Sequence, residues 1–87
     1  MSEKKMTGMT YKIQEMAARI RTLREIAGLS EAEMAQRTGI SVEEYIQCET
    51  GNRNLSIAFL YRCTLSFGVD MSDLLEGRSA KLRAYDL

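Results

Sequence analysis

The sequence repeats one helix-start pattern on either side of a glycine. Ser30 is followed three residues later by Glu33, and Ser41 is followed three residues later by Glu44. In each copy the serine hydroxyl can accept a hydrogen bond from the glutamate amide, while the carboxylate reaches back to the serine amide. Gly39 lies between the copies, where a left-handed backbone conformation costs glycine little and ends a helix. The sequence therefore predicts two short helices that meet at a sharp corner.

Helical periodicity extends from Thr10 to about Glu76, with no strand-like alternation and no proline. Glycines and serines divide this stretch into five helices. We therefore expect an all-α fold in which the five helices share one core. The first helix carries apolar residues at spacings of three and four: Ile13, Met16, Ala17, Ile20, Leu23 and Ala27. The other expected helices span about 30–38, 41–50, 57–67 and 71–76. In the fourth, the residues expected to be buried are Leu60, Cys63, Thr64 and Phe67.

The composition is that of one small globular domain. Of the 87 residues, 45% are hydrophobic and 28% are charged, which excludes a disordered tail. No apolar run approaches the roughly 20 residues of a membrane span, and the polar start lacks a signal peptide's apolar stretch. We therefore expect a cytoplasmic protein without a membrane partner.

Catalytic and metal-binding chemistry has little support. The chain contains no histidine, so neither a Ser-His nor a Cys-His arrangement can form, and no glycine-rich phosphate loop is present. Cys48 and Cys63 lie at apolar helix positions. A redox pair or half a metal site has no further ligands to support it, so core packing is favoured. We expect neither an enzyme nor a bound cofactor or metal.

Three runs of residues resemble the XRE-type, lambda-repressor-like helix-turn-helix family, over about residues 13–75. They are Arg21-x-Leu-Arg-Glu-x-Ala-Gly-Leu-Ser, Met34-Ala35-x-x-x-Gly39-Ile40-Ser41 and Glu49-x-Gly51-x-Arg53-Asn54. The resemblance implies a compact five-helix domain whose second and third helices form the helix-turn-helix. It also implies a transcriptional regulator that binds double-stranded DNA as a homodimer, with its third helix in the major groove.

In that family, an arginine of the first helix pairs with a glutamate of the third and fixes the recognition helix to the body. This chain has Arg24 and Glu49 at the matching positions. The alternative is a solvated surface bridge of little energetic value.

The family's base-contacting positions correspond to Val42, Glu43, Glu44 and Gln47. Gln47 is suited to a bidentate contact with adenine. Glu43 and Glu44 would bring negative charge toward the phosphates unless one accepts from a cytosine amino group. Glu44 has an alternative role as the capping partner of Ser41.

Phosphate contacts are expected from both helix starts and from the loop after the third helix. The residues are Ser30 and Ser41, through their amides and hydroxyls, and Asn52, Arg53 and Asn54. Glu31 stands where the family often has a phosphate-contacting glutamine, which removes one donor.

The charge is unevenly distributed along the chain. Residues 1–25 hold six Lys/Arg and three Asp/Glu, a balance of +3, whereas residues 31–50 hold Arg37 and five glutamates, a balance of −4. Because DNA affinity depends on phosphate neutralisation, the net charge of zero predicts weak binding by one domain alone. A dimer would double the contacts. Alternatively, Lys4, Lys5 and Lys12 could form a basic arm, although a solvated leader is the simpler interpretation.

The predicted organisation is a flexible leader over 1–10, a helix-turn-helix domain over 11–77, and an extended segment over 78–87. The last segment is similar to the link in family members that continue into a cupin-type sensory barrel. A small-molecule effector would act only through such a missing domain. The segment could instead pair with its copy in a dimer, or fray.

A second functional class also fits the sequence. The same fold could serve as a protein-interaction or dimerisation module with weak or no DNA binding. An apolar patch joining Val42 and Tyr45 on the third helix would favour that alternative.

Overall fold

The chain folds into five α-helices, as shown by a computed structural model that describes residues 8–76. They are α1 (Gly8–Ala27), α2 (Glu31–Thr38), α3 (Val42–Glu49), α4 (Ile57–Phe67) and α5 (Met71–Glu76). The all-α prediction is confirmed, with α1 beginning two residues earlier than expected. The predicted leader up to residue 7 and the segment 78–87 lie outside the described residues. Among the helices of 8–76, none has the length and apolarity needed to cross a bilayer.

Serine side chains begin three of the helices. Ser30, Ser41 and Ser56 have extended backbones, and each hydroxyl accepts a hydrogen bond of 3.0 Å from the amide three residues ahead. Each bond satisfies a helix amide that has no partner within the helix. The predicted starts of α2, α3 and α4 are therefore confirmed.

The corner between α2 and α3 is formed at Gly39, which has φ 77° and ψ 29°. The amides of Gly39 and Ile40 both donate to the carbonyl of Ala35, at 2.9 and 3.1 Å. These bonds cap the end of α2 and redirect the chain into Ser41. The predicted hinge is thus confirmed.

We expect Gly39→Val to lower the free energy of unfolding by about 1 kcal/mol or more, because a branched residue is strained at positive φ. A Cβ there would also lie 3.2 Å from Nη1 of Arg62. Gly28→Val is the comparison: Gly28 has φ 74° and shares the strain, but its added Cβ would meet no atom within 4 Å, so any larger loss in Gly39→Val measures the contact with Arg62. Thermal unfolding measures both changes, and an unaltered melting temperature for Gly39→Val would contradict the role of the hinge.

The core lies where α1 meets the other helices. The buried apolar residues are Met16, Ala17, Ile20, Leu23, Met34, Ala35, Tyr45, Cys48, Phe59, Leu60, Cys63, Val69 and Leu74. Phe67, expected to be buried, is only partly buried, and Ala27, at the end of the apolar row of α1, is exposed. Each is the last residue of its helix, where fewer neighbouring elements cover the side chain.

Both cysteines lie in the core as free thiols, as predicted. Burial raises the pKa of Cys48 and raises that of Cys63 to about 12. Both therefore remain protonated at neutral pH and act as small apolar side chains.

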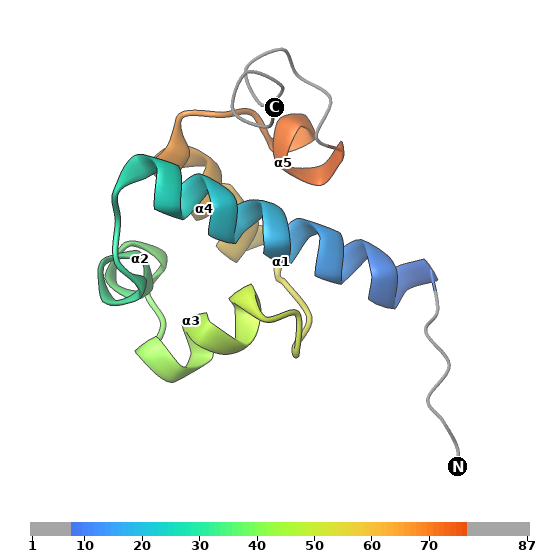
Figure 1. Cartoon of the computed structure of the whole chain (residues 1–87), viewed down its shortest axis with the longest axis horizontal. Helices are drawn as coiled ribbons and strands as arrows, with labels where there is room; N and C mark the ends of the chain where they lie inside the picture. Colours follow the sequence, from blue (N-terminus) through green and yellow to red (C-terminus); the bar gives the residue numbers. More distant parts are fainter. Residues whose placement is uncertain (1–7, 77–87) are drawn as a thin grey trace.

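The helix α1 runs across the molecule, with α2 and α3 on one side and α5 on the other (Figure 1). Nη1 of Arg19 donates to the carbonyl of Leu74 at 2.5 Å and joins α1 to α5. Nη1 of Arg62 donates to the carbonyl of Thr38 at 3.0 Å and joins α4 to α2. Neither of these two hydrogen bonds involves α3, and one face of α3 is exposed to solvent.

Candidate nucleic-acid interface

The helix α3 has one buried and one exposed face. Tyr45, Cys48 and Glu49 are buried, in keeping with their spacings of three and four. The other five residues of the helix are exposed: Val42, Glu43, Glu44, Ile46 and Gln47. The four predicted base-contacting residues therefore lie together on the open side of α3.

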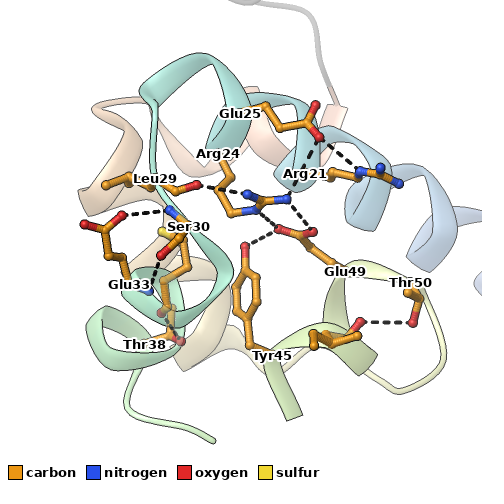
Figure 2. Close-up of polar contacts among 12 residues, drawn as sticks. Arg21, Arg24, Glu25, Leu29, Ser30, Glu33, Thr38, Tyr45, Glu49 and Thr50 are labelled. Carbon is orange, nitrogen blue, oxygen red and sulfur yellow. Dashed lines mark hydrogen bonds and ion pairs between the residues drawn. The ribbon is translucent and has the colours of Figure 1, made fainter. Parts of the chain in front are cut away.

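Arg24 of α1 is bonded to Glu49 of α3, and Tyr45, also on α3, bonds the same carboxylate (Figure 2). Nε and Nη2 of Arg24 donate to the two carboxylate oxygens of Glu49, at 2.5 and 3.3 Å. The Tyr45 hydroxyl donates to Glu49 Oε2 at 2.5 Å, and Nη1 of Arg24 donates to the Leu29 carbonyl at 2.9 Å. The Arg24 and Glu49 side chains are only 11% and 4% exposed, so the structure has the buried arrangement and not the solvated bridge.

The protonation states of this cluster match its hydrogen bonds. The hydrogen bond to Glu49 raises the pKa of Arg24, so the guanidinium stays charged. Burial raises the pKa of Tyr45, so its hydroxyl keeps the proton that it donates. A charged donor from α1 and a neutral donor from α3 itself therefore share one carboxylate, and the Arg24 bonds join α3 to α1.

Sequence reasoning missed one contact and one exposed residue of α3. The contact of Tyr45 with Glu49 was detectable, because residues four apart share a helix face. Ile46 was also missed, although it lies four residues after Val42 and both side chains are exposed. Thymine methyl groups are the apolar features of the major groove, and such side chains can contact them.

Glu44 is the capping partner of Ser41, the role that the sequence offered as an alternative to a base contact. Its Oε1 accepts from the Ser41 amide at 3.0 Å, and that bond lowers its pKa. The Arg53 guanidinium lies 3.9 Å from Glu44 Oε2 and donates to Gln47 Oε1 at 3.5 Å. The candidate adenine contact and the candidate phosphate contact are therefore neighbours on the open side of α3.

The serine amides cannot serve as phosphate donors in this conformation. The Ser30 amide donates to Glu33 at 2.7 Å, and the Ser41 amide donates to Glu44 at 3.0 Å. Each serine hydroxyl oxygen accepts a hydrogen bond from a backbone amide, and the hydroxyl proton can still be donated to another group. The helix starts can thus offer serine hydroxyls to phosphate, but not the serine amides that we expected.

The loop after α3 is folded against the helix that it follows. The amides of Gly51 and Asn52 donate to the carbonyls of Cys48 and Gln47, at 3.3 and 3.0 Å. The predicted phosphate-contacting residues of this loop, Asn52, Arg53 and Asn54, are all exposed.

The open side of α2 and α3 is acidic. The charge of Glu49 is compensated by Arg24, but Glu33, Glu43 and Glu44 are exposed. Backbone hydrogen bonds from the capping serines lower the pKa of Glu33 and Glu44, so both are ionised at neutral pH. A phosphate group that approached this side would therefore be repelled by these carboxylates.

The structure excludes an apolar patch of Val42 and Tyr45. Tyr45 is fully buried, and its ring centroid lies 6.0 Å from that of Phe59 on α4. The exposed apolar pair of α3 is instead Val42 and Ile46.

Comparisons with known proteins agree with this architecture. A family model described as "Helix-turn-helix domain" matches residues 15–76. No curated protein sequence matches the chain.

Three solved structures illustrate the similarity. The clp gene regulator ClgR from C. glutamicum is 22% identical, with a TM-score of 0.69 over 74% of this chain and 82% of its own. The restriction-modification controller protein C.AhdI from Aeromonas hydrophila is 23% identical, with a TM-score of 0.68 over 74% of this chain and 97% of its own. An HTH_3 family transcriptional regulator from Vibrio cholerae is 26% identical, with a TM-score of 0.68 over 79% of this chain and 39% of its own. The family match covers residues 15–76, most of the chain, which therefore belongs to the helix-turn-helix domain family.

Proposed function

We propose that this protein is a sequence-specific DNA-binding transcriptional regulator that acts as a homodimer, with α3 of each copy in the major groove. The observation that carries the proposal is the two-sided construction of α3. Its inner face is held by the bonds of Arg24 to Glu49 and by the Tyr45 ring beside Phe59 of α4. Its outer face exposes Gln47 and Ile46. A recognition helix needs this combination of a fixed angle and a free polar face. The regulators among the similar structures support the same function.

In this proposal Gln47 contacts adenine, Val42 and Ile46 pack against neighbouring thymine methyl groups, and Arg53 contacts phosphate. Glu43 is available to accept from a cytosine amino group. The hydroxyls of Ser30 and Ser41 fix the register on the backbone, together with Asn52 and Asn54.

We expect Gln47→Ala to weaken binding to the preferred site by about 1–3 kcal/mol and to spare non-specific binding, because only base contacts carry sequence information. The site is first selected from a random duplex pool, and affinities are then measured by fluorescence anisotropy. Gln36→Ala is the matched control, since Gln36 is an exposed glutamine on α2 outside the proposed contacts. Equal losses in both variants would contradict the role of Gln47.

Arg53→Ala should weaken binding to all duplexes alike and reduce the slope of log affinity against log salt concentration by about one, because it removes one phosphate contact.

Glu43→Gln should strengthen non-specific binding by removing a negative charge from the open side of α3. Salt titrations with a random-sequence duplex measure both effects. If the full-length chain shows no salt-dependent binding to any duplex at low ionic strength, the regulator proposal is wrong.

A second candidate is a protein-interaction module, favoured by the acidic surface around Glu33, Glu43 and Glu44. Such a surface suits a basic partner. This alternative expects no effect of Gln47→Ala on any duplex, so the same titrations separate the two functions.

A further inference from the structure

The open side of α3 places one carboxylate beside two apolar side chains. Val42 and Ile46 are 39% and 37% exposed, and Glu43 is exposed as well. Ile46 follows Val42 by four residues and Glu43 by three, so the three side chains are neighbours on the helix surface. They are here called the Glu43 cluster. A carboxylate and an apolar surface side by side restrict the base that both can contact at once.

Glu43 differs from the other exposed glutamates of α2 and α3. Glu33 and Glu44 accept from the amides of their capping serines, at 2.7 and 3.0 Å, and the Arg53 guanidinium lies 3.9 Å from Glu44 Oε2. Within residues 8–76, no hydrogen bond or ion pair engages the Glu43 carboxylate. Both of its oxygens are therefore available to a ligand.

A carboxylate without a partner selects a base that donates. In the major groove, cytosine presents the N4 amino group and adenine the N6 amino group, whereas guanine and thymine present acceptors. A carboxylate that loses water without gaining a donor is costly, and the phosphates on either side repel it. At the edge of a base, Glu43 is therefore accommodated beside cytosine or adenine only.

The apolar part of the Glu43 cluster adds a second requirement. Val42 and Ile46 suit a methyl group, which thymine carries at C5 and which cytosine and adenine lack. Thymine carries its O4 acceptor on the ring atom next to that methyl group, so it would direct O4 at the Glu43 carboxylate. None of the four unmodified bases therefore offers both an amino donor and a methyl group.

The base that offers both is 5-methylcytosine, which has the N4 amino group of cytosine and the C5 methyl group of thymine on adjacent ring atoms. We propose that the Glu43 cluster recognises 5-methylcytosine. The Glu43 carboxylate accepts from N4, and Ile46, flanked by Val42, packs against the C5 methyl group. This recognition rests on the proposed function, since it requires α3 to lie in the major groove. An aliphatic side chain alone does not distinguish the methyl group of thymine from that of 5-methylcytosine, so the discrimination belongs to Glu43.

Duplexes that differ at one base pair test the proposal. The full-length protein selects a site from a random duplex pool in which every cytosine is 5-methylcytosine. Each 5-methylcytosine of that site is then replaced in turn by cytosine or by thymine, with the opposite base matched, and affinities are measured by fluorescence anisotropy. At one position, 5-methylcytosine should bind about threefold to fivefold more tightly than cytosine, because one methyl group is buried. It should bind about tenfold or more tightly than thymine, because thymine lacks the N4 donor.

Two variants separate the two parts of the recognition. Glu43→Ala keeps the apolar side chains, so it should retain the preference for the methyl group and lose most of the discrimination against thymine. Ile46→Ala should bind the methylated and unmethylated forms alike and still reject thymine. The affinity ratios are compared within each variant, because loss of the Glu43 charge strengthens binding to every duplex.

Glu15→Ala and Ile26→Ala are the matched controls. Both residues are exposed on α1, outside the proposed contacts. Each variant should keep both preferences of the wild type. Circular dichroism melting verifies that all four variants are folded.

The results that overturn this recognition differ from those that overturn the DNA-binding proposal. A site that is bound specifically, but equally well in its methylated and unmethylated forms, contradicts the recognition of 5-methylcytosine and leaves the regulator proposal standing. A selected site without cytosine does the same, as does a Glu43→Ala or Ile46→Ala variant that keeps both preferences of the wild type. Absence of binding to every duplex, methylated or not, overturns both proposals.

Discussion

Glu49→Ala is expected to lower the free energy of unfolding by about 3–5 kcal/mol, the range for breaking a buried ion pair by removing one partner. The substitution leaves the Arg24 guanidinium with the Leu29 carbonyl as its buried acceptor, and it removes the acceptor of the Tyr45 hydroxyl. Urea unfolding of wild type and variant measures the difference.

An exposed pair in the same chain provides the control. Nε of Arg21 lies 3.3 Å from Glu25 Oε2, and both side chains are more than half exposed. Arg21→Ala should therefore cost no more than about 0.5 kcal/mol. Glu25 is kept, because its Oε2 also lies 4.0 Å from Arg24 Nη2. A double-mutant cycle with Arg24→Met and Glu49→Ala isolates the coupling, and a value near zero would show that the buried contact contributes nothing.

The functional consequence of the same substitution separates stability from positioning. The Arg24 and Glu49 contact sets how α3 lies on α1, and the proposed DNA contacts depend on that angle. At temperatures where the variant remains folded, specific binding should fall more than non-specific binding. Equal losses would indicate that the cluster stabilises the fold without orienting the helix.

The local features of the fold could be predicted because they depend on residues close in sequence. The capping bonds of Ser30 and Ser41 each join residues three apart, and Gly39 acts through its own backbone conformation. The contact between Arg24 and Glu49 spans 25 residues, and no local pattern specifies it. It was expected only from the resemblance to a family.

The surface of α3 could be predicted only in part, because exposure depends on how the helices pack. The sequence places Val42 and Tyr45 three residues apart, which allows a shared face, yet Tyr45 is buried and Val42 is exposed. The sequence predicted the serine amides both as capping donors to Glu33 and Glu44 and as phosphate donors, and the structure has the capping bonds. The exposure of Ile57, Tyr61 and Leu65 on α4 was not predicted, since periodicity alone does not show which of two apolar faces is covered.

Tyr45→Ala is expected to destabilise the fold by about 3–5 kcal/mol, because it removes a large and fully buried ring. The ring packs beside Phe59, so its loss opens a cavity between α3 and α4. Tyr45→Phe is the matched control. It keeps the ring and loses only the hydrogen bond to Glu49, whose carboxylate remains bonded to Arg24, so it should cost about 0.5–1.5 kcal/mol. Equal costs for the two variants in urea unfolding would show that the hydrogen bond to Glu49, and not the packing of the ring, accounts for the stability that Tyr45 contributes.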